Sequence, residues 1–143
     1  MQTAGHGRHP GGLGHGGPAP PDGVLRGGLA PWQERRAKQM LAADLKSRVR
    51  LGELAAACRL SRSHFARAFK ASTGLAPHQW RLREQVRLAQ RLLAGSARPI
   101  GQIAAECGFA DQSHLTRAFS RIVHATPARW RAERRRSRAG APL

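Results

Sequence analysis

Apolar residues recur at steps of three and four positions between residues 31 and about 136, and glycines and prolines interrupt the pattern. This spacing predicts amphipathic helices, since no stretch shows the alternation typical of strands. Three prolines stand where helices would begin, a position that tolerates a missing N–H: Pro31, Pro77 and Pro127. Gly74 and Gly95 stand where helices would end. The pattern therefore predicts an all-α fold.

An internal repeat organises this helical part of the chain. The segment LGELAAAC at residues 51–58 returns as IGQIAAEC at residues 100–107, and SHFARAF at residues 63–69 returns as SHLTRAF at residues 113–119. Two copies are too few for a solenoid, which needs at least about three. The repeat therefore predicts two small lobes.

Each copy predicts a helix-turn-helix unit, the first at about residues 51–73. One buried stripe marks its short first helix: Leu51, Leu54, Ala55 and Cys58. Ser61 is placed to cap the second helix. That helix would bury three residues, Phe65, Ala68 and Phe69, and would present four others outward, Ser63, Ala66, Arg67 and Lys70. The outward face is therefore small, polar and basic, as a helix in a DNA major groove requires.

The second unit, at about residues 100–123, repeats this arrangement, with Asp111 as the expected cap. Its second helix would bury Leu115, Ala118, Phe119 and Ile122. Its outward residues would be Gln112, Ser113, Thr116, Arg117 and Arg121. Arginine offers bidentate bonds to guanine, glutamine prefers adenine, and the threonine methyl group can touch thymine.

A long helix at about residues 77–94 is predicted to connect the two units. Its inward stripe would be Leu82, Val86, Ala89 and Leu93. A stiff connector would hold the two recognition helices at a fixed separation, about 34 Å for successive major grooves on one side of B-DNA. The predicted target is therefore a bipartite site.

The two ends of the chain have a different composition. Residues 1–29 are rich in Gly, Pro and His with almost no periodic apolar positions, which predicts a disordered tail. Three histidines lie in it without a spacing that fixes metal geometry: His6, His9 and His15. Residues 137–143 are expected to be a frayed basic end, which leaves residues 30–136 as the folded domain.

The net charge of the chain limits the classes of partner that it is expected to bind. The 143 residues contain 25 Lys plus Arg against 8 Asp plus Glu, a net charge of +17, and 22 of the basic residues are Arg. Such an excess favours a nucleic-acid partner. The scattered acids, without paired carboxylates or a Gly-rich phosphate loop, argue against an enzyme. Cys58 and Cys107 lack metal-ligand spacing and lie on predicted core stripes, and no apolar run is long enough for a membrane span.

These features resemble the C-terminal DNA-binding domain of the AraC/XylS family of bacterial transcription regulators, over about residues 31–136. The resemblance rests on both helix-turn-helix units, on FKASTGLAP at residues 69–77, on AQRLL at residues 89–93 and on IAAECGF at residues 103–109. It implies seven helices, sequence-specific promoter binding and, often, contact with RNA polymerase. It implies no cofactor.

By position, the resemblance assigns base reading to Ser63, Ala66, Arg67, Gln112, Ser113 and Arg117. Because Ala66 cannot hydrogen-bond a base, Arg62 and Arg67 are expected to carry more of the first contact, and Thr116 is added from the outward face of the second helix. Phosphate contacts are expected from Lys70, Arg81, Arg121 and Arg131. His124 replaces the family's usual glycine, matched by Gly74, so strain is expected there.

No segment is long and regular enough for the effector domain that many relatives carry, so we expect no small-molecule site. We expect a monomer, and we expect it in the cytoplasm because the sequence lacks both the apolar core of a signal peptide and a run long enough to span a membrane. His64 and His114 are open to two interpretations, core packing, which is slightly favoured, and phosphate contact. Trp80 and Trp130 are expected to pack in the core. The competing hypothesis for function is a basic protein that coats nucleic acid without sequence preference.

Overall fold

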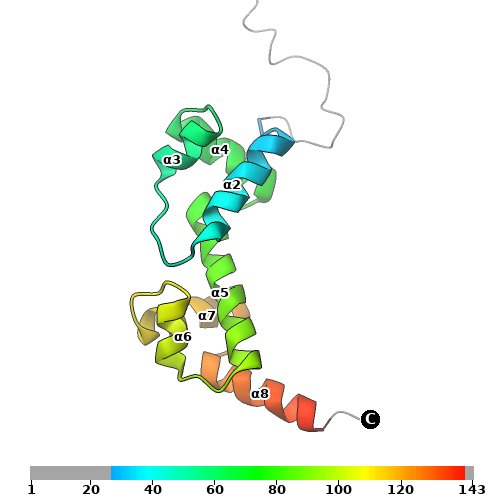
Figure 1. Ribbon diagram of the computed structural model, residues 1–143. Coiled ribbons are helices and arrows are strands. Elements are labelled where there is room, and N and C mark those ends of the chain that lie inside the picture. The colour runs from blue at the N-terminus through cyan, green and yellow to red at the C-terminus, as the bar shows by residue number, and fades with distance from the viewer. Residues whose placement is uncertain (1–26, 141–143) are drawn as a thin grey trace, which may run out of the picture.

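The computed structural model describes residues 27–140, and in this part of the chain the secondary structure consists of helices joined by loops, without strands (Figure 1). Its helices are α2 (Pro31–Ala43), α3 (Leu51–Ala57), α4 (Arg62–Thr73), α5 (Pro77–Gly95), α6 (Ile100–Glu106), α7 (Gln112–Val123) and α8 (Pro127–Ala139). The all-α prediction, with two helix-turn-helix units and a long connecting helix, is confirmed. Most of the predicted tail, with its three histidines, lies outside the described residues.

The helix starts follow from the sequence. Pro31, Pro77 and Pro127 are each the first residue of their helix. In both recognition helices the predicted cap forms: the Ser61 hydroxyl accepts a hydrogen bond from the His64 N–H at 3.2 Å, and the Asp111 carboxylate accepts one from the His114 N–H at 2.8 Å. Each cap satisfies a backbone donor that the first turn leaves unpaired.

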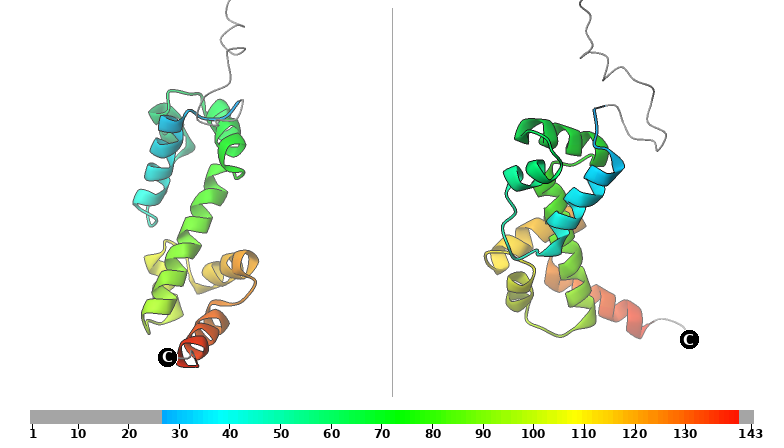
Figure 2. Two further views of the ribbon diagram at one scale, coloured as in Figure 1. Left: turned by 90° about the vertical axis from the view of Figure 1, so that its right-hand side faces the viewer. Right: turned by 45° about the horizontal axis from the view of Figure 1, so that its top comes forward.

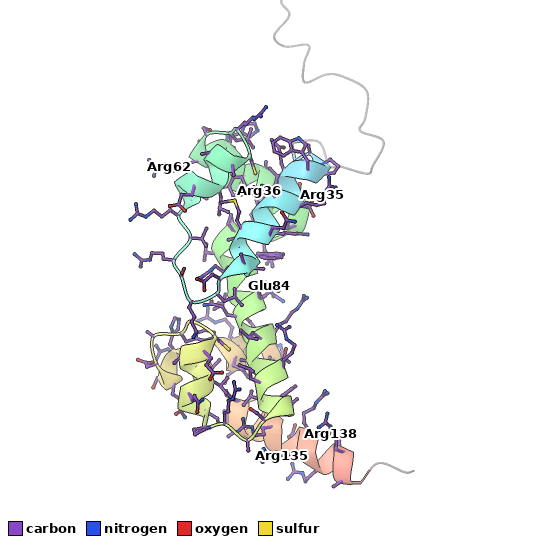
Figure 3. The ribbon with its side chains drawn as sticks, viewed as in Figure 1. Arg35, Arg36, Arg62, Glu84, Arg135 and Arg138 are labelled. Atoms are coloured by element: carbon purple, nitrogen blue, oxygen red, sulfur yellow. The ribbon has the colours of Figure 1, made fainter. Side chains whose placement is uncertain are left out.

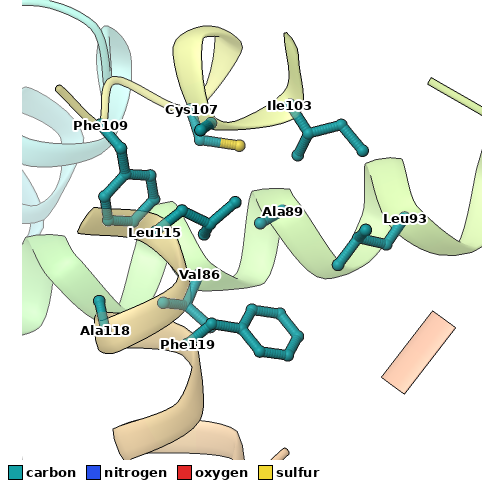
Figure 4. Close-up of a cluster of buried hydrophobic side chains, with 10 residues drawn as sticks. Val86, Ala89, Leu93, Ile103, Cys107, Phe109, Leu115, Ala118 and Phe119 are labelled. Carbon is teal, nitrogen blue, oxygen red and sulfur yellow. The ribbon is translucent and has the colours of Figure 1, made fainter. Parts of the chain in front are cut away.

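Two separate hydrophobic cores hold the lobes. The first lies between α2, α3 and α4 and is built around Phe65 and Phe69, whose ring centroids are 5.6 Å apart. The second lies between α5, α6 and α7 (Figure 4). Its buried members are Val86, Ala89, Leu93, Ile103, Ala104, Cys107, Phe109, Leu115, Ala118 and Phe119. Most of the predicted core positions are therefore buried, with Leu82 and Ile122 partly buried at the edge of the second core. Leu51, predicted for the buried stripe of the first unit, is instead exposed, because it is the first residue of the short helix α3.

The aromatic pairs repeat between the lobes, as the sequence repeat predicts. Trp80 meets Phe69 edge to face at 6.3 Å, and Trp130 meets Phe119 in the same way at 5.9 Å. Edge-to-face contact is a favourable arrangement of aromatic rings. The two tryptophans are half-buried against the cores, so the expectation that they pack rather than stack on bases agrees with their contacts.

Both recognition helices end in a left-handed residue. Gly74 ends α4 with φ of 83°, and His124 ends α7 with φ of 67°. A side chain with a Cβ adopts this region at a cost, whereas glycine does not. The strain expected at His124 is therefore present in the backbone.

The ordered part exceeds the predicted domain at both ends. Leu29, placed in the tail by composition, is buried in the first core, and its N–H donates to the Ser72 hydroxyl at 2.7 Å. At the other end α8 continues through Ala139, although residues 137–143 were expected to fray. One buried leucine in a Gly/Pro-rich stretch gives no periodic signal, which explains the first difference.

The lobes meet at a junction formed by Leu45, Arg81, Gln85 and Gly108, which we call the interlobe junction. The buried Gln85 side chain donates to the Leu45 carbonyl of the first lobe at 3.3 Å and to the Cys107 carbonyl of the second at 3.1 Å. Gly108 has φ of 89°, and a Cβ built on it would overlap the Leu45 carbonyl oxygen. The two backbones therefore approach here at a distance that only glycine permits.

Candidate nucleic-acid interface

The outward face of α4 carries the residues predicted for base reading in the first unit. Arg62, Ser63 and Arg67 are exposed, while Phe65 and Phe69 anchor the opposite face in the core. Ala66 is half-buried and lines a mainly apolar cavity of about 490 Å³ between α3, α4 and the start of α5. The polar atoms that this face offers therefore come from Ser63 and the two arginines.

The outward face of α7 repeats the arrangement with more hydrogen-bonding groups. Gln112, Ser113 and Arg117 are exposed and Thr116 is half-buried. These four side chains together line one shallow depression on the surface of α7. This single patch thus combines a guanidinium, an amide, two hydroxyl groups and the threonine methyl group. Such a set of groups suits contact with base edges.

Each recognition helix also touches the helix that precedes it through a glycine that sequence reasoning did not single out. A Cβ on Gly52 would lie 3.7 Å from the Arg62 Cδ, and one on Gly101 would lie 3.4 Å from the Gln112 Oε1. The two glycines hold equivalent positions in the repeat. They leave room for the first residue of each recognition helix to lie against its scaffold helix.

The residues predicted to contact phosphate divide into two groups. Lys70 and Arg121 are exposed in the last turns of α4 and α7, where a phosphate could reach them. Arg81 instead donates to the Leu45 carbonyl at 2.9 Å and also to the Ser47 carbonyl. Its guanidinium is bonded to the α2–α3 loop, and the phosphate role expected for it stays a prediction.

Arg131 is also turned into the protein. It is half-buried, and its Nε donates to the Leu93 carbonyl at 3.2 Å near the end of α5. Burial, and after it the nearby charge of Arg135, lowers the pKa of the Arg131 guanidinium below its ordinary value. An arginine that bonds a carbonyl near the end of a helix stabilises that end. Arg131 therefore has a structural contact, and the phosphate role expected for it stays a prediction.

The paired histidines and cysteines differ in what surrounds them. His64 and His114 are both exposed, and the His114 ring meets Phe109 edge to face at 5.1 Å, so it packs on the rim of the second core. Cys58 and Cys107 are both buried and free. Burial, followed by the charge of Glu106, raises the pKa of the Cys107 thiol to about 11, which keeps it protonated and unreactive.

The two recognition helices lie toward opposite ends of α5 and on the same side of the molecule, with α2 and α6 toward the other side (Figures 1 and 2). The structure therefore brings the predicted residues together as two patches, one for each lobe. The interlobe junction fixes one patch relative to the other. Sequence reasoning missed Gln85, although a polar residue beside the apolar stripe of the connecting helix was the signal available.

No helix within residues 27–140 combines the length and the apolar character that a membrane crossing requires. The same residues contain no group of three or more His, Cys, Asp or Glu side chains arranged to hold a metal ion.

A family profile described as a helix-turn-helix domain matches residues 54–133 of this chain. The chain is similar to the probable transcriptional regulator LumQ of Photobacterium leiognathi, with 36% identity over 86 residues, or 60% of this chain and 35% of that protein. It is 33% identical to the MmsAB operon regulatory protein of Pseudomonas aeruginosa over 97 residues, or 68% of this chain and 32% of that protein. The chain thus spans about a third of the length of these relatives.

Solved structures of DNA-binding transcription regulators are also similar to this chain. The DNA-binding domain of AdpA, a global transcriptional factor solved in complex with a target DNA, is similar with a TM-score of 0.69 and 32% identity, over 76% of this chain and 98% of that domain. A transcriptional regulator of the AraC type from Chromobacterium violaceum shares the fold with a TM-score of 0.67 and 24% identity, over 78% of this chain and 95% of that one.

Proposed function

We propose, from the premise that this chain belongs to the AraC-type helix-turn-helix family of DNA-binding transcription regulators, that it reads a bipartite promoter site with α4 and α7. The observation that carries this proposal is the repetition of one exposed pattern on two rigidly seated helices. Ser63 and Arg67 on α4 correspond to Ser113 and Arg117 on α7, and all four are exposed. A requirement for solubility alone would not place them at equivalent positions.

In this proposal the two patches read bases with different stringency. On α7, Arg117 would bond guanine and Gln112 adenine, while the Thr116 methyl group would touch thymine. On α4, Ala66 offers no hydrogen bond, so Arg62 and Arg67 would supply most of the discrimination. Lys70 and Arg121 would bind phosphates at the edges of the two grooves and so set the register of the helices.

The finer features of the proposal extend beyond DNA binding. We propose that the protein acts as a monomer in the cytoplasm, where bacterial DNA lies, that it contacts RNA polymerase, and that it needs no cofactor. Two recognition helices within one chain support monomeric binding, because each unit can occupy one half-site. Regulation of transcription without an enzymatic step follows the family.

Selection of the full chain on a pool of random duplexes, followed by sequencing, tests the proposal. We expect an enriched motif with two conserved blocks about one helical turn apart, or about 10 base pairs between centres. A protein that only coats nucleic acid would enrich no such motif, and its binding would depend steeply on salt for every sequence. That outcome would support the competing hypothesis.

Replacement of Arg117 by alanine then tests the assignment of base reading. On the selected duplex the loss is expected to be about 1–3 kcal/mol of binding free energy, with a smaller loss on random duplex. Arg129→Ala provides a matched control, because Arg129 is an exposed arginine of α8 that pairs with Glu133 at 3.1 Å. Equal losses on selected and random DNA would reduce Arg117 to a phosphate contact.

A further inference from the structure

Four arginines converge on a groove between α5 and α8 that the proposed interface does not use. Arg87 and Arg91 come from α5, and Arg134 and Arg138 come from α8. The groove has a volume of about 530 Å³, and the half-buried Trp130 forms part of its wall. Figure 3 shows Arg138 near the end of α8. We call this feature the arginine groove.

The charge of the arginine groove is largely uncompensated. Arg87 pairs with Glu84 at 3.3 Å, and the Arg134 guanidinium lies 5.1 Å from the centre of the Trp130 ring. Within residues 27–140, Arg91 and Arg138 have no carboxylate partner. Each helix also places two like charges four residues apart, a spacing that destabilises a helix. Such a cluster is costly for the free protein and becomes favourable when an anion neutralises it.

The arginine groove and the α7 patch lie on different faces of the second lobe. Val86, Ala89 and Leu93 of α5 point into the core that α7 covers, and Arg87 and Arg91 fall on the opposite side of α5 at 3.6 residues per turn. Ser113 and Arg117 point away from the same core on its other side. The thickness of the core therefore separates the two surfaces.

We propose that the arginine groove binds the phosphate backbone of a second DNA duplex while α4 and α7 hold the first. This inference rests on the proposed function, because the first duplex is the one read by the recognition helices. The guanidinium fork bonds phosphate oxygens in a bidentate manner. The arginines flank a groove between two helices and do not stand on the projecting face of one helix that could enter a major groove. The second duplex is therefore held by its phosphates, without regard to its sequence.

The wall of the groove favours nucleic acid over an acidic protein. A stable protein interface is centred on apolar anchors that fill pockets. Trp130 is the one large apolar side chain among the residues that line the groove, and it is already engaged by Phe119 and Arg134. Four arginines along one groove, with no acidic residue among its lining residues, fit a backbone of regularly spaced phosphates.

A capture experiment with the full chain tests the inference. Beads carry the duplex selected by the wild-type protein, and after washing they receive a fluorescent duplex without the selected site. The wild type is expected to retain this second duplex. The variant R91Q/R138Q is expected to hold the bead duplex as the wild type does, and to lower the slope of log affinity against log salt for the second duplex by about 2.

A second double variant controls for the change in net charge. R35Q/R36Q removes two exposed arginines from α2 (Figure 3) and should leave capture of the second duplex unchanged. Thermal unfolding monitors the fold, and R91Q/R138Q should not lower the melting temperature because it relieves like-charge repulsion.

Three results would overturn the inference. Bead-bound wild type could retain no second duplex, both double variants could lose capture equally, or polyglutamate could displace the second duplex more effectively than unlabelled DNA at equal charge. The last result would assign the groove to an acidic polypeptide. A failure of the proposed function is distinguishable, since it would appear on the beads as equal binding of the selected and random duplexes.

Discussion

His124 and Gly74 are equivalent residues that meet the same backbone demand with different side chains. Both end a recognition helix in the left-handed region, with φ of 67° and 83° respectively. A residue with a Cβ pays about 1–2 kcal/mol for this conformation. The His124 N–H donates to the Ser120 carbonyl at 2.9 Å, as the Gly74 N–H donates to the Lys70 carbonyl at 2.8 Å, so the two helix ends have the same backbone bond. The second lobe therefore stores strain at the end of α7.

Exchange of these two residues measures the strain. His124→Gly is expected to raise the free energy of unfolding by about 1 kcal/mol, because relief of strain exceeds the added freedom of the unfolded chain. Gly74→His is the matched reverse change and should lower it by about 1–2 kcal/mol. Urea titration followed by circular dichroism gives both values. If His124→Gly destabilised the protein, the imidazole would have a stabilising contact of its own.

The recognition helices depend on their first turns, where the base-reading residues lie. Asp111 holds the first turn of α7 through its 2.8 Å bond to the His114 N–H, and Gln112 and Ser113 lie between these two residues. Loss of such a cap frees a backbone donor and lets the first turn fray. A stable start of α7 is therefore a condition for placing its hydrogen-bonding groups.

Asp111→Ala is expected to cost about 0.5–2 kcal/mol of stability. Faster hydrogen exchange at the His114 amide, measured by nuclear magnetic resonance, should report local fraying beyond the global loss of stability. Ser61→Ala in α4 is the matched change, with its effect at the His64 amide. Unchanged exchange at His114 would mean that the remainder of α7 holds the first turn without the cap.

Local patterns explain most of what the sequence predicted at this scale. Proline starts, the Ser61 and Asp111 caps and the core stripes depend on neighbours within a few positions, and they are confirmed except for the exposed Leu51. The direction of a long side chain depends on segments far along the chain. Arg81 and Arg131 are basic residues at equivalent repeat positions, yet they donate to carbonyls 36 and 38 residues away. Their structural role was therefore not visible in the sequence.

The roles of Gln85 and Leu29 were also not predictable from neighbouring residues. Leu29 donates its N–H to Ser72, which lies 43 residues further along the chain. A glutamine beside an apolar stripe gives no indication of which carbonyls it will bridge, because Leu45 lies in the loop after α2 and Cys107 follows the last residue of α6. The outward faces of α4 and α7 were predictable because helical periodicity alone decides which residues oppose the core. Whether each exposed residue contacts a base or a phosphate stays a prediction.

At the scale of the whole described molecule, residues 27–140, the interlobe junction holds the two lobes together as one unit. The two cores are separate, so α5 alone could flex between them. Gln85 bonds both lobes, Arg81 holds the α2–α3 loop, and Gly108 lets the Leu45 carbonyl approach the turn before α7. These contacts fix the orientation of one recognition helix relative to the other.

Gly108→Ala should loosen the junction, since the added methyl group would overlap the Leu45 carbonyl. We expect weaker binding to the selected duplex and similar binding to a duplex with one half-site, measured by fluorescence anisotropy. One inserted base pair between half-sites turns the second by about 34–36°. The wild type should lose more affinity on this insertion than Gly108→Ala does. Equal losses would mean that α5 alone sets the separation.

Gln85 and Gly108 also bear on how regulatory DNA can change over generations. Under the proposed function, a base substitution in either half-site can be compensated by a substitution of one contacting side chain in α4 or α7. An insertion or deletion between the half-sites cannot be compensated in this way. It rotates one half-site relative to the other about the DNA axis, and no single side chain of a recognition helix reverses that rotation. Promoters bound by such a protein can therefore accumulate base substitutions within the half-sites, while the number of base pairs between the half-sites stays the same.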